Sequence, residues 1–229
     1  MTRILGILAG ALLMTGPATA ASAAAGSGSA LKWEQAFPVS HPEAAVHFVA
    51  TYLDAAGASH RLEVWRVGMR YLHRRSDDRL DLYAVPAAGP GAELAYRLVD
   101  HERHAVFDVA RTNLHRIGVF SNWAAQAHVL ERPATRYTLR KVAAPAGVAV
   151  SGCDWRRIEP EGATPASTVC WSSRWGLPLA IVGGGAPALQ FRVLSVESIK
   201  PAAARALAGL PEIPAGYGYF DSNEEIGPE

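Results

Sequence analysis

The chain has 229 residues, 49% of them hydrophobic and 19% charged, and its 22 Lys and Arg nearly balance its 21 Asp and Glu. This balance argues against a nucleic-acid partner, because binding phosphates requires a basic face. No apolar run reaches the roughly eighteen residues of a membrane-spanning helix, so we do not expect an integral membrane protein.

The first twenty residues have the construction of a secretion signal. Arg3 precedes an apolar run from Ile4 to Met14, and Gly16-Pro17 then leads into a series of small residues. The alternative, a membrane anchor, needs about twenty apolar residues, more than this run offers. We predict a cleaved signal peptide at 1–20, with cleavage possible anywhere from 20 to 25, and a flexible Ala-, Ser- and Gly-rich lead-in at 21–32.

Composition favours the bacterial periplasm as the destination. The basic residues are 19 Arg and 3 Lys, and Ala, Gly and Pro are abundant, which is typical of a GC-rich bacterial genome. The first cysteine is Cys153, so no cysteine at the mature N-terminus can carry a lipid anchor. We therefore expect a soluble periplasmic protein.

Residues 33–229 predict a single α+β domain made mainly of antiparallel strands. Apolar and polar residues alternate from Val46 to Tyr52, from Leu80 to Ala84 and from Leu94 to Leu98, as in strands with one buried face. Short turn sequences separate these runs, which favours hairpins and therefore antiparallel neighbours. With the later runs included, we expect about ten strands.

A helical period interrupts the strands between Arg111 and Leu130. Leu114 and Ile117 lie three apart, and Trp123, Ala127 and Leu130 then follow the spacing i, i+4, i+7.

Strands and one further helix are expected in the last third of the chain. Pro201 and Gly209 bracket a short Ala-rich helix, and an extended tail follows from Pro211. The expected strands are at Tyr137–Leu139, Val148–Ile158, Ser167–Ser172, Leu177–Val182 and Leu189–Ile199.

The two cysteines, Cys153 and Cys170, are interpreted as a structural disulfide. An exported chain meets an oxidising compartment, and a redox pair usually has the closer spacing C-x-x-C. Trp155, Trp171 and Trp175 lie near these cysteines and could stack on a ligand, but packing against the disulfide is favoured.

The familiar catalytic signatures are missing from the sequence, among them G-x-S-x-G, H-E-x-x-H and G-x-x-x-x-G-K-[ST]. We expect no enzyme and no catalytic residue, and we also predict no cofactor and, from the spacing of the histidines, no metal. His101 and His104 are interpreted as solvated turn residues between two strands, and Arg74-Arg75 with Asp77-Asp78 as a wet turn. A histidine- or metal-dependent enzyme would require several histidines to converge from the set His47, His60, His73, His101, His104, His115 and His128.

Three short segments carry a resemblance to a known family: Gly152–Trp155, Val169–Trp171 and Trp175–Ala180. In these segments, and in element order over most of the mature chain, the sequence resembles the LolA/LolB-like superfamily of outer-membrane lipoprotein carriers and their relatives. In that family a late strand pair ends in a G-L-P-L turn. The resemblance implies a strongly curved antiparallel sheet, an incomplete barrel, with helices over its concave face, here Arg111 to Leu130 and also Pro201 to Ala208.

Such a concave apolar face can be filled by side chains or can hold an acyl chain. We therefore expect an exported protein that binds a lipid, an acylated polypeptide or another apolar ligand, as in outer-membrane lipoprotein sorting. The alternative is an interaction or envelope-sensing module with a filled cavity and an envelope protein as partner. The side chains expected to fill the cavity, or to line it around a ligand, are Leu114, Ile117, Phe120, Trp123 and Leu130.

Overall fold

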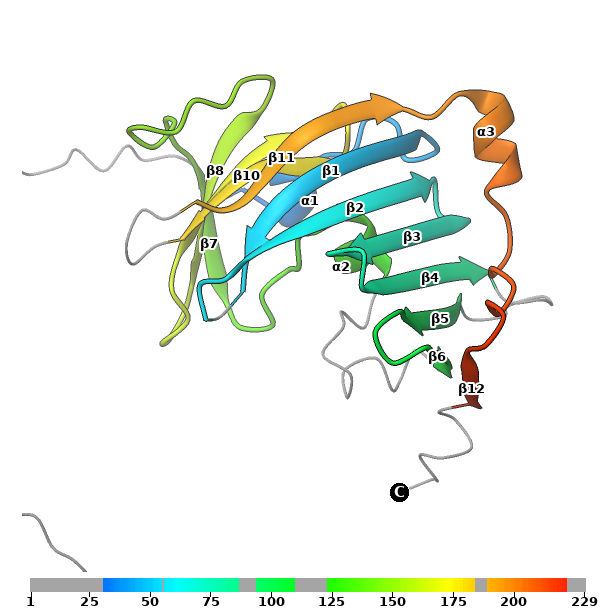
Figure 1. Cartoon of the computed structure of the whole chain (residues 1–229). Coiled ribbons are helices and arrows are strands. Elements are labelled where there is room, and N and C mark those ends of the chain that lie inside the picture. The colour runs from blue at the N-terminus through cyan, green and yellow to red at the C-terminus, as the bar shows by residue number, and fades with distance from the viewer. Residues whose placement is uncertain (1–30, 55, 87–93, 110–122, 184–188, 222–229) are drawn as a thin grey trace, which may run out of the picture.

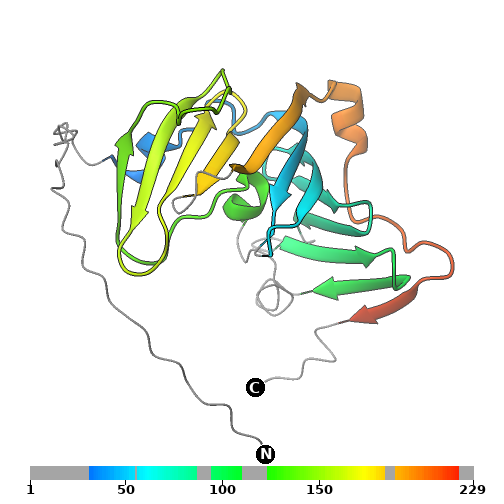
Figure 2. The ribbon, with the colours of Figure 1, turned by 60° about the vertical axis from the view of Figure 1, so that its left-hand side comes forward.

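The computed structural model describes residues 31–54, 56–86, 94–109, 123–183 and 189–221, and these form twelve strands and three short helices (Figure 1). The strands belong to one open, curved sheet (Figure 2). In chain order the elements are α1 (Trp33–Ala36), β1 (Ala45–Leu53), β2 (Ser59–Val67), β3 (Tyr71–Ser76), β4 (Leu80–Pro86), β5 (Leu94–Asp100), β6 (Ala105–Val109), α2 (Trp123–His128), β7 (Tyr137–Lys141), β8 (Asp154–Pro160), β9 (Ser167–Ser172), β10 (Leu177–Gly183), β11 (Leu189–Ser198), α3 (Pro201–Ala206) and β12 (Gly218–Asp221).

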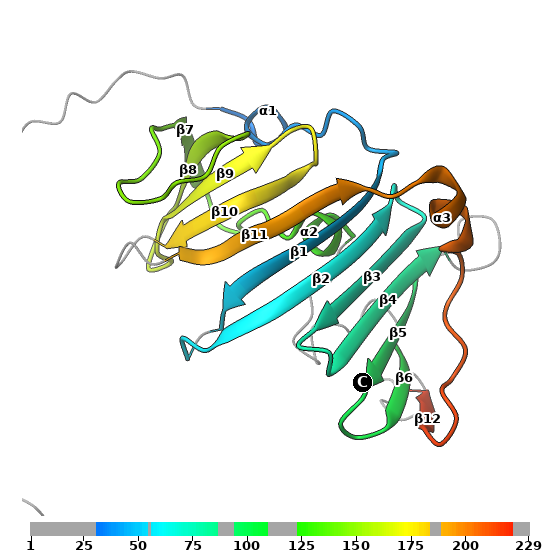
Figure 3. The ribbon, with the colours of Figure 1, turned by 45° about the horizontal axis from the view of Figure 1, so that its top comes forward.

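The sheet consists of two meanders joined in the middle. Strands β1 to β6 follow one another towards one edge, β11 to β7 follow one another towards the other, and β1 pairs with β11 between them (Figure 3). Neighbouring strands are antiparallel except at the first edge, where β12 pairs in parallel with β6. The predicted mainly antiparallel β-structure is confirmed.

Alternation along the strands gives the sheet two different faces. On β1 the side chains that point inward are 0% exposed; they are Val46, Phe48 and Ala50. They belong to the largest hydrophobic cluster, together with Leu62 of β2 and Leu72 of β3. Their strand neighbours point to the opposite side, since successive side chains alternate. We name the first side the α2 face and the second the α3 face, after the helix that packs on each.

The two helices do not share a face. Trp123 and Ala127 of α2 belong to the largest cluster. Ala204 of α3 instead packs with Val67 of β2 and Tyr71 of β3, which are cross-strand partners on the α3 face. The helix predicted after Pro201 is therefore confirmed, but it does not lie beside α2 as a second part of the same plug.

The structure departs from the predicted elements at one strand boundary and in two elements that were not predicted. β8 begins at Asp154 and not at Val148, because Gly152, with φ 78°, breaks the extended backbone just before it. The four-residue helix α1 and the edge strand β12 were not predicted. Residues 1–30, with the predicted signal and most of the lead-in, and Leu114, Ile117 and Phe120 lie outside the described residues. Among the helices that are described, none has the length and apolar character needed to cross a membrane.

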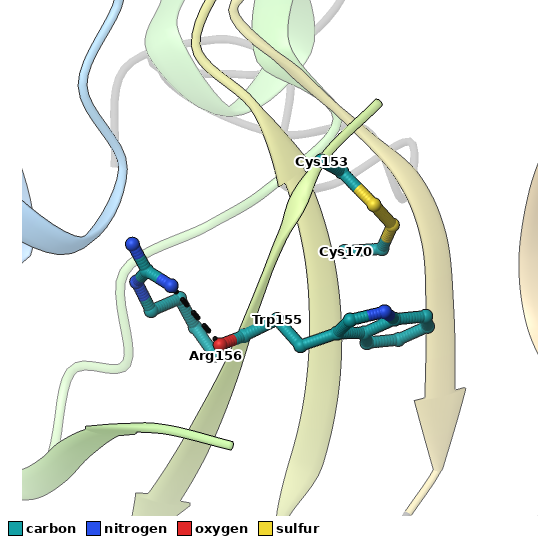
Figure 4. The surroundings of a disulfide bond; sticks show 4 residues. All are labelled: Cys153, Trp155, Arg156 and Cys170. Carbon is teal, nitrogen blue, oxygen red and sulfur yellow. Dashed lines mark hydrogen bonds between the residues drawn. A yellow bond between two sulfur atoms is a disulfide. The ribbon is translucent and has the colours of Figure 1, made fainter. Parts of the chain in front are cut away.

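The predicted disulfide between Cys153 and Cys170 is present. It links the residue before β8 to the neighbouring strand β9, with the two Cα atoms 5.3 Å apart. On β8, Trp155 points to the side of the disulfide while Arg156 points away from it (Figure 4). Trp155 and Cys170 are both buried in one small hydrophobic cluster, which confirms core packing for this tryptophan.

Reduction of this disulfide should lower the free energy of unfolding. The bond joins residues 17 apart in sequence, and the entropy of closing such a loop corresponds to about 3 kcal/mol. Urea denaturation with and without reductant measures the change. The double variant Cys153→Ser/Cys170→Ser is the control and should not respond to reductant; an unchanged midpoint for the reduced native chain would contradict the prediction.

Candidate functional site

The C-terminal end of α2 is the most unusual polar feature of the buried interior. Ala125, Gln126 and Ala127 are at most 1% exposed, so the helix end lies away from water. The last carbonyls of a helix have no partners within the helix and must find them elsewhere. The sheet supplies those partners from two neighbouring strands.

Arg66 of β2 provides most of these hydrogen bonds. Its Nη1 donates to the carbonyl oxygens of Ala127, at 2.8 Å, and Gly176, at 3.2 Å, and its Nη2 donates to that of Trp175 at 2.6 Å. The side chain is only 3% exposed. Burial lowers the pKa of Arg66 to about 10, so it stays charged at neutral pH. Within the described residues this buried cation pairs with no carboxylate and relies on main-chain carbonyls.

Arg74 of β3 adds a second contact beside the first. Its Nη1 donates to the carbonyl of Gln126 at 3.3 Å, and burial lowers the pKa of Arg74 to about 10. The carbonyls of Gln126 and Ala127 are consecutive, so one arginine from each of two paired strands contacts the helix end. A cation at a helix C-terminus also interacts favourably with the helix dipole. We call Arg66 and Arg74 the α2 clamp.

His128, the last residue of α2, connects the clamp to the turn between β9 and β10. Its Nδ1 lies 2.5 Å from the Gly176 carbonyl oxygen and 2.9 Å from Arg66 Nη1. Burial, reinforced by the charge of Arg66, lowers the pKa of His128, so the ring is neutral at pH 7. The next residue, Val129, has φ 52°, a left-handed conformation that costs a β-branched residue about 1–2 kcal/mol. The structure thus holds strained backbone directly after the clamped helix.

Gly176 supplies the carbonyl that both Arg66 and His128 contact. It has φ 61°, and a Cβ atom built on it would lie 2.8 Å from Cγ1 of Val39. Only glycine satisfies both constraints. The glycine of the G-L-P-L turn that was noted in the sequence therefore has a specific role here as the third contact of the α2 end.

An apolar pocket of about 290 Å³ lies beside His128. Its walls come from α1, the segment after it, the segment after α2, and β9. We call it the aromatic pocket; it is lined by Trp33, Glu34, Phe37, Pro38, Val39, His128, Leu130 and Trp171.

The structure separates the two predicted cavity residues that it describes. Trp123 packs in the largest cluster, whereas Leu130 packs in a second cluster and lines the aromatic pocket. Sequence reasoning missed Arg66, Arg74 and His128 as parts of one arrangement. A usable signal existed for the arginines, since each follows inward apolar residues of its strand at the spacing of two.

The interpretation of Arg74-Arg75 with Asp77-Asp78 as a wet turn is confirmed for the two aspartates, which lie in the turn between β3 and β4, but was wrong for the arginines. Both arginines lie on β3, and Arg75 donates from Nε and Nη2 to the carboxylate of Asp81, which is 1% exposed, at 2.8 and 3.0 Å. Burial alone would raise the pKa of Asp81, but the contacts of His73, Arg75 and His101 outweigh burial and hold that pKa well below its ordinary value.

His101 was also misinterpreted, since it is not simply solvated. It does lie in the predicted turn between β5 and β6, but its Nε2 contacts Asp81 at 3.0 Å and its Nδ1 contacts the Tyr217 hydroxyl at 2.9 Å. With both ring nitrogens engaged, His101 ties the C-terminal segment to the α3 face. His73 lies 3.0 Å from Asp81 without a well-aligned hydrogen bond. Among the described residues, no three His, Cys, Asp or Glu side chains are grouped so as to hold a metal ion.

Comparison with known proteins adds no family to this description. No family model matches the chain, and a search of the curated proteins finds no match.

Replacing Gly176 by alanine should destabilise the fold more than the same change at Gly147. Both glycines have positive φ, but a Cβ on Gly147 meets nothing within 4 Å. Gly147→Ala should therefore cost only the backbone term of about 1–2 kcal/mol, and Gly176→Ala at least about 1 kcal/mol more. Thermal and urea unfolding measure the difference; equal losses would show that the approach to Val39 is easily relieved.

Protonation of His128 should weaken the α2 end in acid. Its folded pKa lies below the unfolded value of 6.5, so its contribution to stability is complete above that pH and is lost as the pH falls. The pKa of His60 is shifted in the opposite direction, because hydrogen bonding to Asp77 and Asp54 raises it. The contribution of His60 to stability is therefore lost as the pH rises through its pKa in the folded state.

Titration of the histidine ring resonances by NMR tests the directions of both pKa shifts in one molecule. The midpoint of His128 should lie below 6.5 and that of His60 above it. His128→Gln should remove the acid-induced rise in amide exchange along α2, whereas His41→Gln, at an exposed position, should leave that rise unchanged. A His128 midpoint at or above that of His60 would refute the assignment.

Proposed function

We propose that this protein is exported to the periplasm and binds an apolar ligand, the acyl chain of a lipid or of an acylated polypeptide, on the α2 face of its sheet. In this proposal the sheet acts as an incomplete barrel, and α2 is a plug that the ligand displaces. The binding reaction is the exchange of one apolar occupant for another. No chemistry on the ligand is involved.

The observation that carries the proposal is the α2 clamp. Removing charged groups from water is expensive, and a helix that served only to complete a core would be held more cheaply by apolar contacts. Arg66 and Arg74 instead hold a six-residue helix through its main-chain carbonyls. Hydrogen bonds of this kind depend strongly on distance and angle, so they favour one position of α2 and are lost together when it moves. A clamp of this type suits a two-state element.

The surface beneath α2 supports an apolar ligand. Phe48, Leu62 and Leu72 present aliphatic and aromatic side chains on the α2 face, and Trp123 is the largest side chain that α2 contributes to their cluster. An acyl chain could bury the same side chains that Trp123 buries now. The predicted signal peptide and the resemblance to lipoprotein carriers imply the same class of ligand and the same compartment.

The alternative function is a protein-interaction or envelope-sensing module. It is favoured by the complete burial of the central side chains on the α2 face, since Phe48, Val64 and Leu72 are each 0% exposed. Under this alternative α2 stays in place and a partner protein binds elsewhere on the surface. An enzyme that uses the histidines ranks third.

The test is ligand binding to the native chain and to a variant with a weakened clamp. Native mass spectrometry after gentle purification from a membrane-containing host should reveal a copurified lipid, and cis-parinaric acid should bind saturably. Arg66→Met removes charge-assisted hydrogen bonds worth about 1.5–3 kcal/mol each. The open state should become more populated, and binding should tighten by about tenfold or more.

Arg140→Met is the matched control, because Arg140 is an exposed arginine on β7 whose partner is Glu159. It should change neither the affinity for cis-parinaric acid nor amide exchange along α2. Arg66→Lys, which keeps the charge but loses the forked donors, serves if Arg66→Met does not fold. Absence of a copurified lipid, together with no binding by the native chain or by either Arg66 variant, would reject the proposal in favour of the interaction module.

A further inference from the structure

The aromatic pocket lies at the second hydrophobic cluster, whereas Trp123 of α2 packs in the largest cluster. Six of its eight lining residues are apolar: Trp33, Phe37, Pro38, Val39, Leu130 and Trp171. Its volume of about 290 Å³ is at the small end of the range for ligand sites. It therefore suits one alkyl or aromatic group and is too small for a whole lipid.

The walls of the pocket are fixed by contacts that do not involve a ligand. Trp171 donates from Nε1 to the carbonyl of Pro38 at 2.7 Å. The ring of Phe37 meets Trp171 edge-on at 5.4 Å and packs 4.5 Å from Trp33. Trp33 in turn meets Tyr137 at 5.8 Å. A pocket built in this way is preformed, which reduces the cost of binding.

Charge is confined to the rim of the pocket. Glu34 is the one acidic lining residue, and its side chain is 74% exposed and lies 3.8 Å from Arg132. The polar residue inside is His128, which is neutral at pH 7 because burial lowers its pKa. The interior thus matches an uncharged alkyl end, with any polar head left at the rim.

The pocket also touches the two residues on either side of the strained Val129. His128 and Leu130 both line it, and His128 Nδ1 is within 2.9 Å of Arg66. A group that fills the pocket contacts the segment that ends α2. Because Val129 stores backbone strain, small displacements of its neighbours can release that strain.

We propose that the aromatic pocket is an acyl-end subsite: it takes the terminal methylenes of one alkyl chain, and its occupation loosens the clamped end of α2. This proposal rests on the proposed function, since it supplies the point at which an acyl ligand first engages the protein. The pocket binds the chain end while α2 is still closed. Displacement of α2 then opens the larger apolar face to the rest of the chain.

A short alkyl probe distinguishes binding in the aromatic pocket from binding on the α2 face. 10-Bromodecan-1-ol carries an alkyl chain and a bromine that quenches tryptophan fluorescence on contact. We expect saturable quenching of the native chain and a shift of the Trp171 indole N–H resonance. Hydrogen exchange along residues 123–128 should accelerate at least fivefold when the probe is saturating.

Leu130→Trp fills the pocket and should weaken probe binding at least tenfold and abolish the effect on exchange. Leu194→Trp adds the same ring at a position on β11 that is 59% exposed, and should change neither. If Leu130→Trp does not fold, Leu130→Ser removes an apolar wall and should weaken the probe in the same direction.

Failure of the subsite can be distinguished from failure of the proposed function. Equal probe binding by native chain and Leu130→Trp would overturn the subsite, as would binding that leaves exchange along α2 unchanged. Neither result depends on whether cis-parinaric acid binds, which decides the proposed function. The subsite is supported if Leu130→Trp loses probe binding and if the probe accelerates hydrogen exchange along α2 only in chains that bind it. This holds even for a chain that retains no long lipid.

Discussion

The pairing of β1 with β11 is the contact on which the rest of the architecture depends. It joins residues as far apart as His47 and Glu197, whose side chains meet across the two strands at a separation of 150 positions. Without it the chain would form two separate meanders, each with an unpaired edge in the middle of what is now one sheet. The pairing also brings the turn between β9 and β10 within reach of β2. Arg66 can bind the carbonyls of Trp175 and Gly176 only because the two halves are joined.

The two faces of the sheet handle buried charge in different ways. On the α3 face, Asp81 is surrounded by Arg75 and His101, so charge is compensated locally by side chains of adjacent strands and of the turn after β5. On the α2 face, Arg66 and Arg74 use main-chain carbonyls of a separate helix and a turn. The first arrangement is insensitive to movement of α2. The second depends in part on where α2 lies, because the carbonyls of Gln126 and Ala127 belong to that helix, and for this reason the proposed function places the ligand on the α2 face.

Much of the sheet could be predicted from the sequence because one-sided burial imposes a period of two. The run through Phe48 shows that period directly, and short turns between such runs leave only antiparallel pairing. The disulfide followed from the number of cysteines and the expected compartment. The apolar Val148 and Val150 misled the prediction of β8, since they pack beside the disulfide without belonging to a strand.

The candidate site could not be predicted for a different reason. The carbonyls that Arg66 binds are 61 to 110 positions away in sequence, and no local pattern encodes a main-chain partner. His101 has the same difficulty, because its partner Asp81 is 20 positions away on β4. The sequence did contain one signal, which is a charged residue at an inward position of two strands. These residues are Arg66 on β2 and Arg74 on β3. Such residues mark places where a fold uses polarity inside its core.

The long separation between β1 and β11 has a consequence for how the chain must be made. At about 5–20 residues per second, β1 leaves the ribosome roughly 7–30 s before β11, the strand that will pair with its free edge. During that time Val46 and Phe48 stand on a strand with one edge open, and open apolar edges readily pair with other chains. The centre of the sheet can therefore close only after both meanders have been synthesised, and β12, which pairs with β6 at one edge, is synthesised later still. A chain with this topology gains from being kept extended until its C-terminal half has been synthesised, and the proposed export would meet this requirement, because the chain would cross a membrane unfolded.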